Sequence, residues 1–391
     1  MTNPLESLCL QLAHHCAMSR NLPYKVDTTL WKAQELDIKV DTSTLLRYAQ
    51  RHKVLNTVLA PIPSTNGLEN FKRQAALEEG AKSLMLVQWQ AVHRKLNQLK
   101  IPSLVFKGPA LSLQLYGNPY TREYTDLDIL VRFARWKEIV EGLEVLGWIP
   151  KEFSIPMEIA GGSHHVVFVN PYCPFRLEVH RHLDTTEHHT DDEMEQVFTH
   201  MKFYTWNGIE LPTLSALDHF ELILDHGTKH IWTLMHWLLD GASMLSFTDA
   251  ALHEALFRKM EKRRRLLQLQ LMIRLVTSLF PIEIPKAYQT TYRNHRAQVD
   301  RLALHCKERL IGGGTSAPSI SHILYDTYFF RMSFATTLQD KLEVGLSLWR
   351  IPQQDIEKLK LPCFLYWLHY PLRPFFVLGR RIRRKIHKDI A

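Results

Sequence analysis

Asp126 and Asp128 are the two residues of this 391-residue sequence whose type and spacing most clearly suggest chemistry. They lie in the run DLDILV at 126–131, which is typical of a short strand. Residues two apart on a strand share a face, so both carboxylates point the same way while Leu127 and Ile129 point into a core. Because Mg²⁺ binds one or two carboxylates together with phosphate oxygens and water, the pair suits a metal–nucleotide site. A solvated Asp pair beside a strand has the same spacing.

The segment before this strand predicts a strand, a turn and a short helix. An apolar run at 101–106 stops at the KGP sequence of 107–109, where glycine permits a tight turn and proline can open a helix. The apolar residues of 110–116 then predict a short buried helix that ends at a glycine. A polar loop carrying Arg122 leads from this helix to the Asp strand.

Lys107-Gly108, Tyr116, Arg122 and the DLDILV run together resemble the core signature of the DNA polymerase beta-like nucleotidyltransferase superfamily. More closely, they resemble its branch described simply as uncharacterised nucleotidyltransferase, and they are similar to the nucleotidyltransferase toxins of bacterial abortive-infection systems. The specific match covers about residues 100–182. The resemblance implies an enzyme that moves a nucleoside monophosphate from a nucleoside triphosphate (NTP) to an acceptor hydroxyl or phosphate.

The resemblance also implies a third carboxylate. In such folds this residue comes from a later strand and is flanked by apolar residues, a pattern that Glu178 matches between Leu177 and Val179. Asp126, Asp128 and Glu178 are therefore the expected catalytic residues, and the same three are expected to bind two Mg²⁺ ions.

Lys107, Gly108 and Arg122 are the expected nucleotide-binding residues. The two cations would neutralise phosphate charge, and Gly108 would let the backbone approach the phosphates closely. Pro109 departs from the superfamily pattern, because a glycine or serine usually stands there and proline has no N–H to donate. Two alternatives stay open: kinase-type phosphoryl transfer from the same site, and a non-catalytic nucleotide- or RNA-binding regulator.

Four further polar residues are candidates for contacting the acceptor or for orienting a carboxylate. His180 shares a strand face with Glu178, two residues away. His226, Lys229 and Asp240 stand among the apolar residues of predicted helices. The sequence does not identify the acceptor as a small molecule, a peptide or RNA.

A group of histidines follows the Asp strand, and their spacing fits no zinc pattern. These residues are His164, His165, His180, His182, His188 and His189.

The apolar patterns predict an α+β fold: a small mixed β-sheet nucleotidyltransferase core with helices, embedded between N-terminal and C-terminal helical regions. The expected parts are an N-terminal helical region (1–98), the catalytic core (99–212), a C-terminal helical domain (213–370) and a basic tail (371–391). The basic run RKMEKRRR at 258–265 is interpreted as a solvated helix face, with a grip on a phosphate backbone as the alternative.

Composition indicates a cytoplasmic protein. The five cysteines include no CxxC pair, and we find no signal peptide and no run of the ~20 apolar residues that a transmembrane segment needs. The tail at 371–391 carries seven Lys or Arg and one acidic residue. Weak peripheral contact with an anionic membrane, contact with RNA, or a solvated terminal helix would each explain that charge.

Overall fold

The computed structural model describes most of the chain. The described residues are 4–20, 22, 41–59, 68–151, 165–183, 191–246, 249–280, 282–289, 295–312, 326, 329–347, 365 and 368. The chain divides into two compact units, residues 1–317 and 318–391. The finer boundaries expected at 98, 212 and 370 stay predictions.

The first unit is built around a five-stranded mixed sheet. Its strands, in spatial order, are β1 (Ser103–Val105), β2 (Asp126–Val131), β5 (Arg176–His180), β4 (His165–Val169) and β3 (Ile149–Pro150). Strands β2 and β5 are parallel, and the other neighbours are antiparallel. Together with the surrounding helices, this sheet confirms the predicted α+β class.

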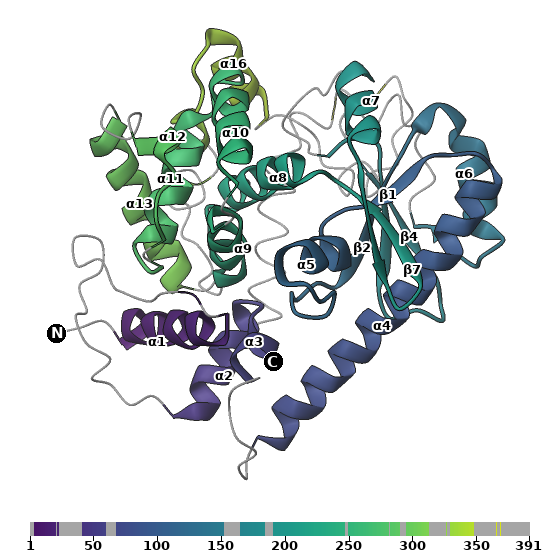
Figure 1. Ribbon diagram of the computed structural model, residues 1–391, viewed down its shortest axis with the longest axis horizontal. Coiled ribbons are helices and arrows are strands. Elements are labelled where there is room, and N and C mark those ends of the chain that lie inside the picture. The colour runs from purple at the N-terminus through teal and green to yellow at the C-terminus, as the bar shows by residue number, and fades with distance from the viewer. Residues whose placement is uncertain are drawn as a thin grey trace. The chain divides into compact units, whose positions relative to one another are not determined.

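One face of the sheet packs against two helices. The inward residues of the central strands, including Leu127, Ile129 and Val179, form a fully buried apolar core. The long helix α4 (Glu69–Gln98) and the shorter α6 (Trp136–Glu144), which follows the 3₁₀ turn η1 (Phe133–Arg135), supply the apolar side chains that cover this face. Figure 1 shows α4 running beside the sheet.

The opposite face is apolar only at one end. Leu130, Leu104 of β1 and Phe106 just after it pack against apolar residues of α7 (Asp191–Thr199) and against Leu222 of α8 (Ala216–Lys229). Asp128 and Asp126 lie on the same face of β2, two and four residues before Leu130, and Glu178 lies beside Asp128 on β5. Alternation along the strands therefore places Asp126 and Asp128 beside this apolar cluster rather than in the core on the opposite face.

The remaining elements of the first unit are one hairpin and several helices. The hairpin pairs β6 (Lys202–Trp206) with β7 (Ile209–Thr213) through Asn207-Gly208, both at positive φ. The helices are α1 (Pro4–Ser19), α2 (Thr42–Arg51), α3 (Leu55–Leu59), α5 (Gly108–Tyr116), α9 (Met235–Leu245), α10 (Ala250–Lys262), α11 (Leu266–Thr277), α12 (Lys286–Gln289) and α13 (Arg296–Ile311).

The first and last helices of this unit are joined by buried polar contacts. The Lys307 ammonium lies 2.7 Å from a carboxylate oxygen of Glu6, and both side chains are almost fully buried. The Tyr48 hydroxyl donates to the carbonyl of Ile311 at 2.7 Å. Helices α1 and α2 are thereby fixed against α13, more than 250 residues away in sequence.

Only part of the basic run at 258–265 is a solvated face: Arg258, Lys262 and Arg264 are exposed, whereas its other three cations form an internal ion-pair network. The Lys259 ammonium lies 2.6 Å from Glu221, and the Arg263 guanidinium lies 2.9 Å from the same carboxylate. Arg265 is buried and pairs with Asp225 at 2.5 Å. These three cations are therefore neutralised by acidic residues of α8, and they fix that helix against α10 and the turn after it.

The second unit contributes two described helices, α15 (Phe330–Met332) and α16 (Leu338–Ser347). The basic tail at 371–391 lies outside the described residues, and its contact with membranes or RNA stays a prediction. Of the helices that the structure describes, none combines the length and the apolar character needed to span a membrane.

We predict that Gly227→Ala destabilises the protein by about 1–3 kcal/mol, the usual cost of overpacking. A Cβ at position 227 would lie 2.6 Å from the indole of Trp232, which is fully buried. The free energy of unfolding from urea denaturation measures the effect.

Gly80→Ala is the matched control. Gly80 is an exposed residue of α4 with no atom within 4 Å of an added Cβ, so alanine should stabilise the helix by up to about 1 kcal/mol. Equal stability of the two variants would contradict the packing described for α8.

Candidate active site

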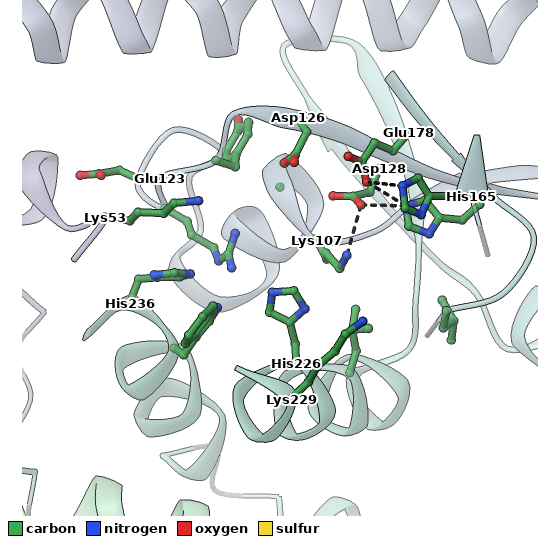
Figure 2. A pocket seen from close by; sticks show the side chains of 17 residues that line it. Lys53, Lys107, Glu123, Asp126, Asp128, His165, Glu178, His226, Lys229 and His236 are labelled. Atoms are coloured by element: carbon green, nitrogen blue, oxygen red, sulfur yellow. Dashed lines mark hydrogen bonds and ion pairs between the residues drawn. The ribbon is translucent and has the colours of Figure 1, made fainter. Parts of the chain in front are cut away.

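A cavity of about 250 Å³ lies within the first unit, at the polar end of the sheet. Its walls come from β2, β4 and β5, from the loop before β2, and from helices α8 and α9. Nine of the ten residues predicted from sequence line it: Lys107, Gly108, Arg122, Asp126, Asp128, Glu178, His180, His226 and Lys229. Figure 2 shows the carboxylates on one side, His226 and Lys229 on the helix opposite, and Lys107 between them.

The three carboxylates converge because of strand register. The parallel pairing of β2 with β5 sets Asp128 directly beside Glu178. Asp126 precedes Asp128 by two residues and therefore lies on the same face. Burial, and then the charges of Asp128 and Glu178, raise the pKa of Asp126. The pocket therefore concentrates negative charge that a bound cation would relieve.

Asp128 is the most buried of the three, with 3% of its surface exposed. Its Oδ1 atom lies 3.2 Å from the Lys107 ammonium and 2.9 Å from Nε2 of His180. Burial alone would raise the pKa of Asp128, but the Lys107 charge and the His180 hydrogen bond outweigh it and hold that pKa well below the ordinary value. Asp128 is thus kept ionised.

Lys107 reaches Asp128 from a strained turn. Its backbone has φ 55° and ψ −150°, a region that lysine rarely adopts and that costs about 1–3 kcal/mol. Gly108 follows at φ 36°; a Cβ there would make only ordinary contacts, so glycine is needed for its backbone angle rather than for space. This turn places the Lys107 ammonium and the first residue of α5 at the pocket wall.

Arg122 is held in the pocket wall by Asp240. The Nε of Arg122 donates to Asp240 Oδ2 at 2.9 Å, and the Tyr116 hydroxyl donates to Asp240 Oδ1 at 2.8 Å. Burial lowers the pKa of Arg122, but the Asp240 carboxylate outweighs burial and raises it. Asp240 does not line the cavity, so the structure places this predicted residue behind Arg122.

Helices α8 and α9 present neutral imidazoles to the cavity. Burial, followed by the charge of Lys107, holds the pKa of His226 well below its ordinary value. Burial and the charge of Arg122 do the same for His236 on α9, which sequence reasoning missed. Trp237 lies beside His236 and also lines the cavity. This wall offers aromatic surface and hydrogen-bonding nitrogens opposite the carboxylates.

Lys53 is a pocket cation that no sequence pattern indicated. It follows helix α2 with φ 55°, and Val54 N–H donates to Ala49 C=O across it, the hydrogen bonding of a Schellman C-cap. Glycine normally marks this position, so a lysine there gives no signal. The cap directs the Lys53 side chain to the cavity (Figure 2).

His165 and Glu123 also line the cavity without having been predicted as site residues. The Nε2 of His165 lies 3.8 Å from Glu178 Oε2, and burial lowers the pKa of His165 to about 4. Burial raises the pKa of Glu123 to about 7, but its carboxylate accepts the N–H of Asn56 at 2.9 Å, at the start of α3. Glu123 therefore caps a helix.

Asp126, Asp128 and Glu178 have the donor chemistry that Mg²⁺ requires. They offer carboxylate oxygens on one rigid face, and burial, followed by the charges of Asp128 and Glu178, raises the pKa of Asp126. The residues present therefore fit the metal that the resemblance implies.

Comparison with known families agrees with this geometry. Residues 38–281, more than half of the chain, match the family model described as uncharacterised nucleotidyltransferase. The fold and the match define a transferase of phosphorus-containing groups. The chain belongs to the uncharacterised nucleotidyltransferase family, which confirms the resemblance found from sequence. No curated protein and no solved structure matches the chain.

We predict that Asp240→Asn destabilises the protein by about 3 kcal/mol, because it leaves the Arg122 guanidinium buried without its ionic partner. Glu254→Gln is the control: Glu254 pairs with Arg258 and both side chains are well exposed, so its loss should cost less than about 1 kcal/mol. Urea denaturation measures both. An Asp240 variant with normal stability would contradict the structural role described for this ion pair.

Proposed function

We propose that the protein transfers a nucleoside monophosphate from an NTP to an acceptor hydroxyl or phosphate, with Mg²⁺ bound by Asp126, Asp128 and Glu178. The observation that carries this proposal is the pairing of Asp128 with Glu178 in neighbouring parallel strands. This pairing brings three carboxylates together on one face of the cavity, near Lys107 and Arg122. Family membership supports nucleotidyl transfer in general.

Bound Mg²⁺ would stabilise the charge on the attacking and leaving oxygens of an in-line displacement. The chain's own contribution is to hold the reacting groups in place. Asp126 and Asp128 supply oxygen ligands from a rigid strand, and Glu178 favours loss of the proton from the acceptor hydroxyl. His180 is 1% exposed and hydrogen-bonded to Asp128, which favours its role in orienting that carboxylate over contact with the acceptor.

The triphosphate would bind across the cations that face the carboxylates. Lys107 and Arg122 come from the loops around α5, Lys229 comes from α8, and Lys53 comes from the end of α2. A triphosphate carries several negative charges, and four cations at one cavity offset them. His226 and Trp237 then remain to contact the base, the ribose or the acceptor.

Kinase-type transfer remains the alternative, because Pro109 opens α5 beside the pocket and removes one N–H from the expected phosphate cradle. The position of the labelled phosphate separates the two reactions. Nucleotidyl transfer moves the α-phosphate and releases pyrophosphate, whereas a kinase moves the γ-phosphate.

We predict that the purified full-length chain, with Mg²⁺ and cell extract as the source of acceptor, transfers label from an α-³²P NTP. Asp126→Asn and Asp128→Asn should each lower transfer at least about 1,000-fold, since metal binding supplies several kcal/mol of transition-state stabilisation. Asp192→Asn, at an exposed residue of α7, should act as wild type. Transfer of γ label alone would contradict the proposal and indicate a kinase.

We predict that Lys53→Gly lowers transfer roughly 100-fold, the lower end of the effect of removing one group that stabilises transition-state charge. Lys100→Gly is a closely matched control: Lys100 also ends a helix at φ 55°, with the same capping hydrogen bonds, but does not line the cavity. Each substitution relieves about 1 kcal/mol of backbone strain, so the two variants should have similar free energies of unfolding. Equal activity would exclude Lys53 from substrate binding.

A further inference from the structure

The cavity contains a second set of potential metal ligands, distinct from the Asp pair. His165, Glu178 and His180 each offer one ligand atom, and these atoms all lie within 4.8 Å of one another. The Nε2 atoms of both histidines approach the same carboxylate oxygen of Glu178, at 3.8 Å from His165 and 3.5 Å from His180. Among the residues that the structure describes, this is the one group of three His, Cys, Asp or Glu side chains whose ligand atoms lie that close together.

The strands fix this group. His165 on β4 is paired with His180 on β5, and Glu178 is paired with Val167 two positions along. The two imidazoles stack with their centroids 4.9 Å apart and an angle of 26° between the rings. Tetrahedral ligands about 2.1 Å from a shared ion stand about 3.4 Å apart, so side-chain shifts of roughly 1.4 Å or less close the site.

The two donor sets differ in chemistry. Asp126 and Asp128 offer only carboxylate oxygens, which suit Mg²⁺. Two imidazole nitrogens with one carboxylate suit a divalent transition metal, because Zn²⁺ and its first-row neighbours bind imidazole far more strongly than Mg²⁺ does. Glu178 belongs to both sets and can bridge them.

We propose that His165, Glu178 and His180 bind a divalent transition-metal ion of the Zn²⁺ class, next to the Mg²⁺ position formed by Asp126 and Asp128. The two cation positions of the cavity then differ in their metal preference. The ion would take the place of the proton between His180 Nε2 and Asp128 Oδ1, which lie 2.9 Å apart, and Asp128 could then supply a fourth ligand. A role for this ion in phosphate binding rests on the proposed function, but its binding does not.

The test measures metal binding by the full-length chain without nucleotide. Protein stripped with a chelator and then freed of it is titrated calorimetrically with ZnCl₂ and, separately, with MgCl₂. Co²⁺ serves as a spectroscopic probe, because its visible absorption reports on nitrogen ligation. The variants are His165→Gln, His180→Gln, Asp126→Asn and His200→Gln; His200 is an exposed residue that follows α7.

We expect wild type, the His200 variant and the Asp126 variant to bind one Zn²⁺ equally well at this site. His165→Gln and His180→Gln should weaken that binding by about 100-fold or more, since altering even an outer-shell partner of a metal site costs 10–100-fold. If His180→Gln fails to fold, His165→Gln decides, because His165 is partly exposed and does not contact Asp128 in the way that His180 does.

Zn²⁺ affinity that is unchanged in His165→Gln, or that falls in Asp126→Asn and not in His165→Gln, would overturn the proposal. Because binding is measured without turnover, this result is independent of the labelled-NTP assay. If the protein fails to bind Zn²⁺ but still transfers the α label, only the proposed transition-metal site is contradicted. Zn²⁺ binding without any label transfer would support the metal site and contradict the proposed function.

Discussion

The parallel pairing of β2 with β5 is the constraint on which the site depends. It sets Asp128 beside Glu178 and leaves Asp126 on the same face, so three carboxylates meet in a partly buried cavity. A one-residue slip in register would send the Glu178 side chain to the opposite face, into the apolar core. Neighbouring cations and imidazoles partly offset the negative charge that this register concentrates, and Lys107 and His180 contact Asp128 directly. The contact from Lys107 requires a strained backbone at that residue.

The helices around the sheet position the opposite wall. Helix α8, which carries His226 and Lys229, is fixed to α10 through Glu221 and its basic partners. Helix α9 is tied to the loop before β2 by the Asp240–Arg122 pair, and Met235 N–H donates to His52 at the end of α2. The N-terminal helices therefore do more than cover the core, because the same turn that receives α9 presents Lys53 to the cavity. Segments nearly 200 residues apart in sequence thus build one site.

Local patterns in the sequence were sufficient for the strand, turn and helix from 101 to 116 and for the Asp strand, because periodicity, Gly-Pro and Asp-x-Asp act over a few residues. Glu178 could be found only through resemblance, since its pairing with Asp128 is not local. Asp240 illustrates what sequence could not settle: the ion pair that buries it spans 118 residues. Lys53 occupies a position where glycine is the usual signal, and His165 joins Glu178 only through strand pairing. The β6–β7 hairpin was missed, although Asn207-Gly208 is a strong hairpin signal.

The most direct test of the account is the position of bound metal in a crystal of the full-length chain grown with Mn²⁺ and a non-hydrolysable NTP analogue. Anomalous scattering from manganese locates the ions without assumptions about their ligands. The account predicts an anomalous peak within coordination distance of Asp126 and Asp128, in contact with the triphosphate, with Glu178 beside it. Manganese and nucleotide bound elsewhere on the protein, with these three carboxylates free of metal, would contradict it.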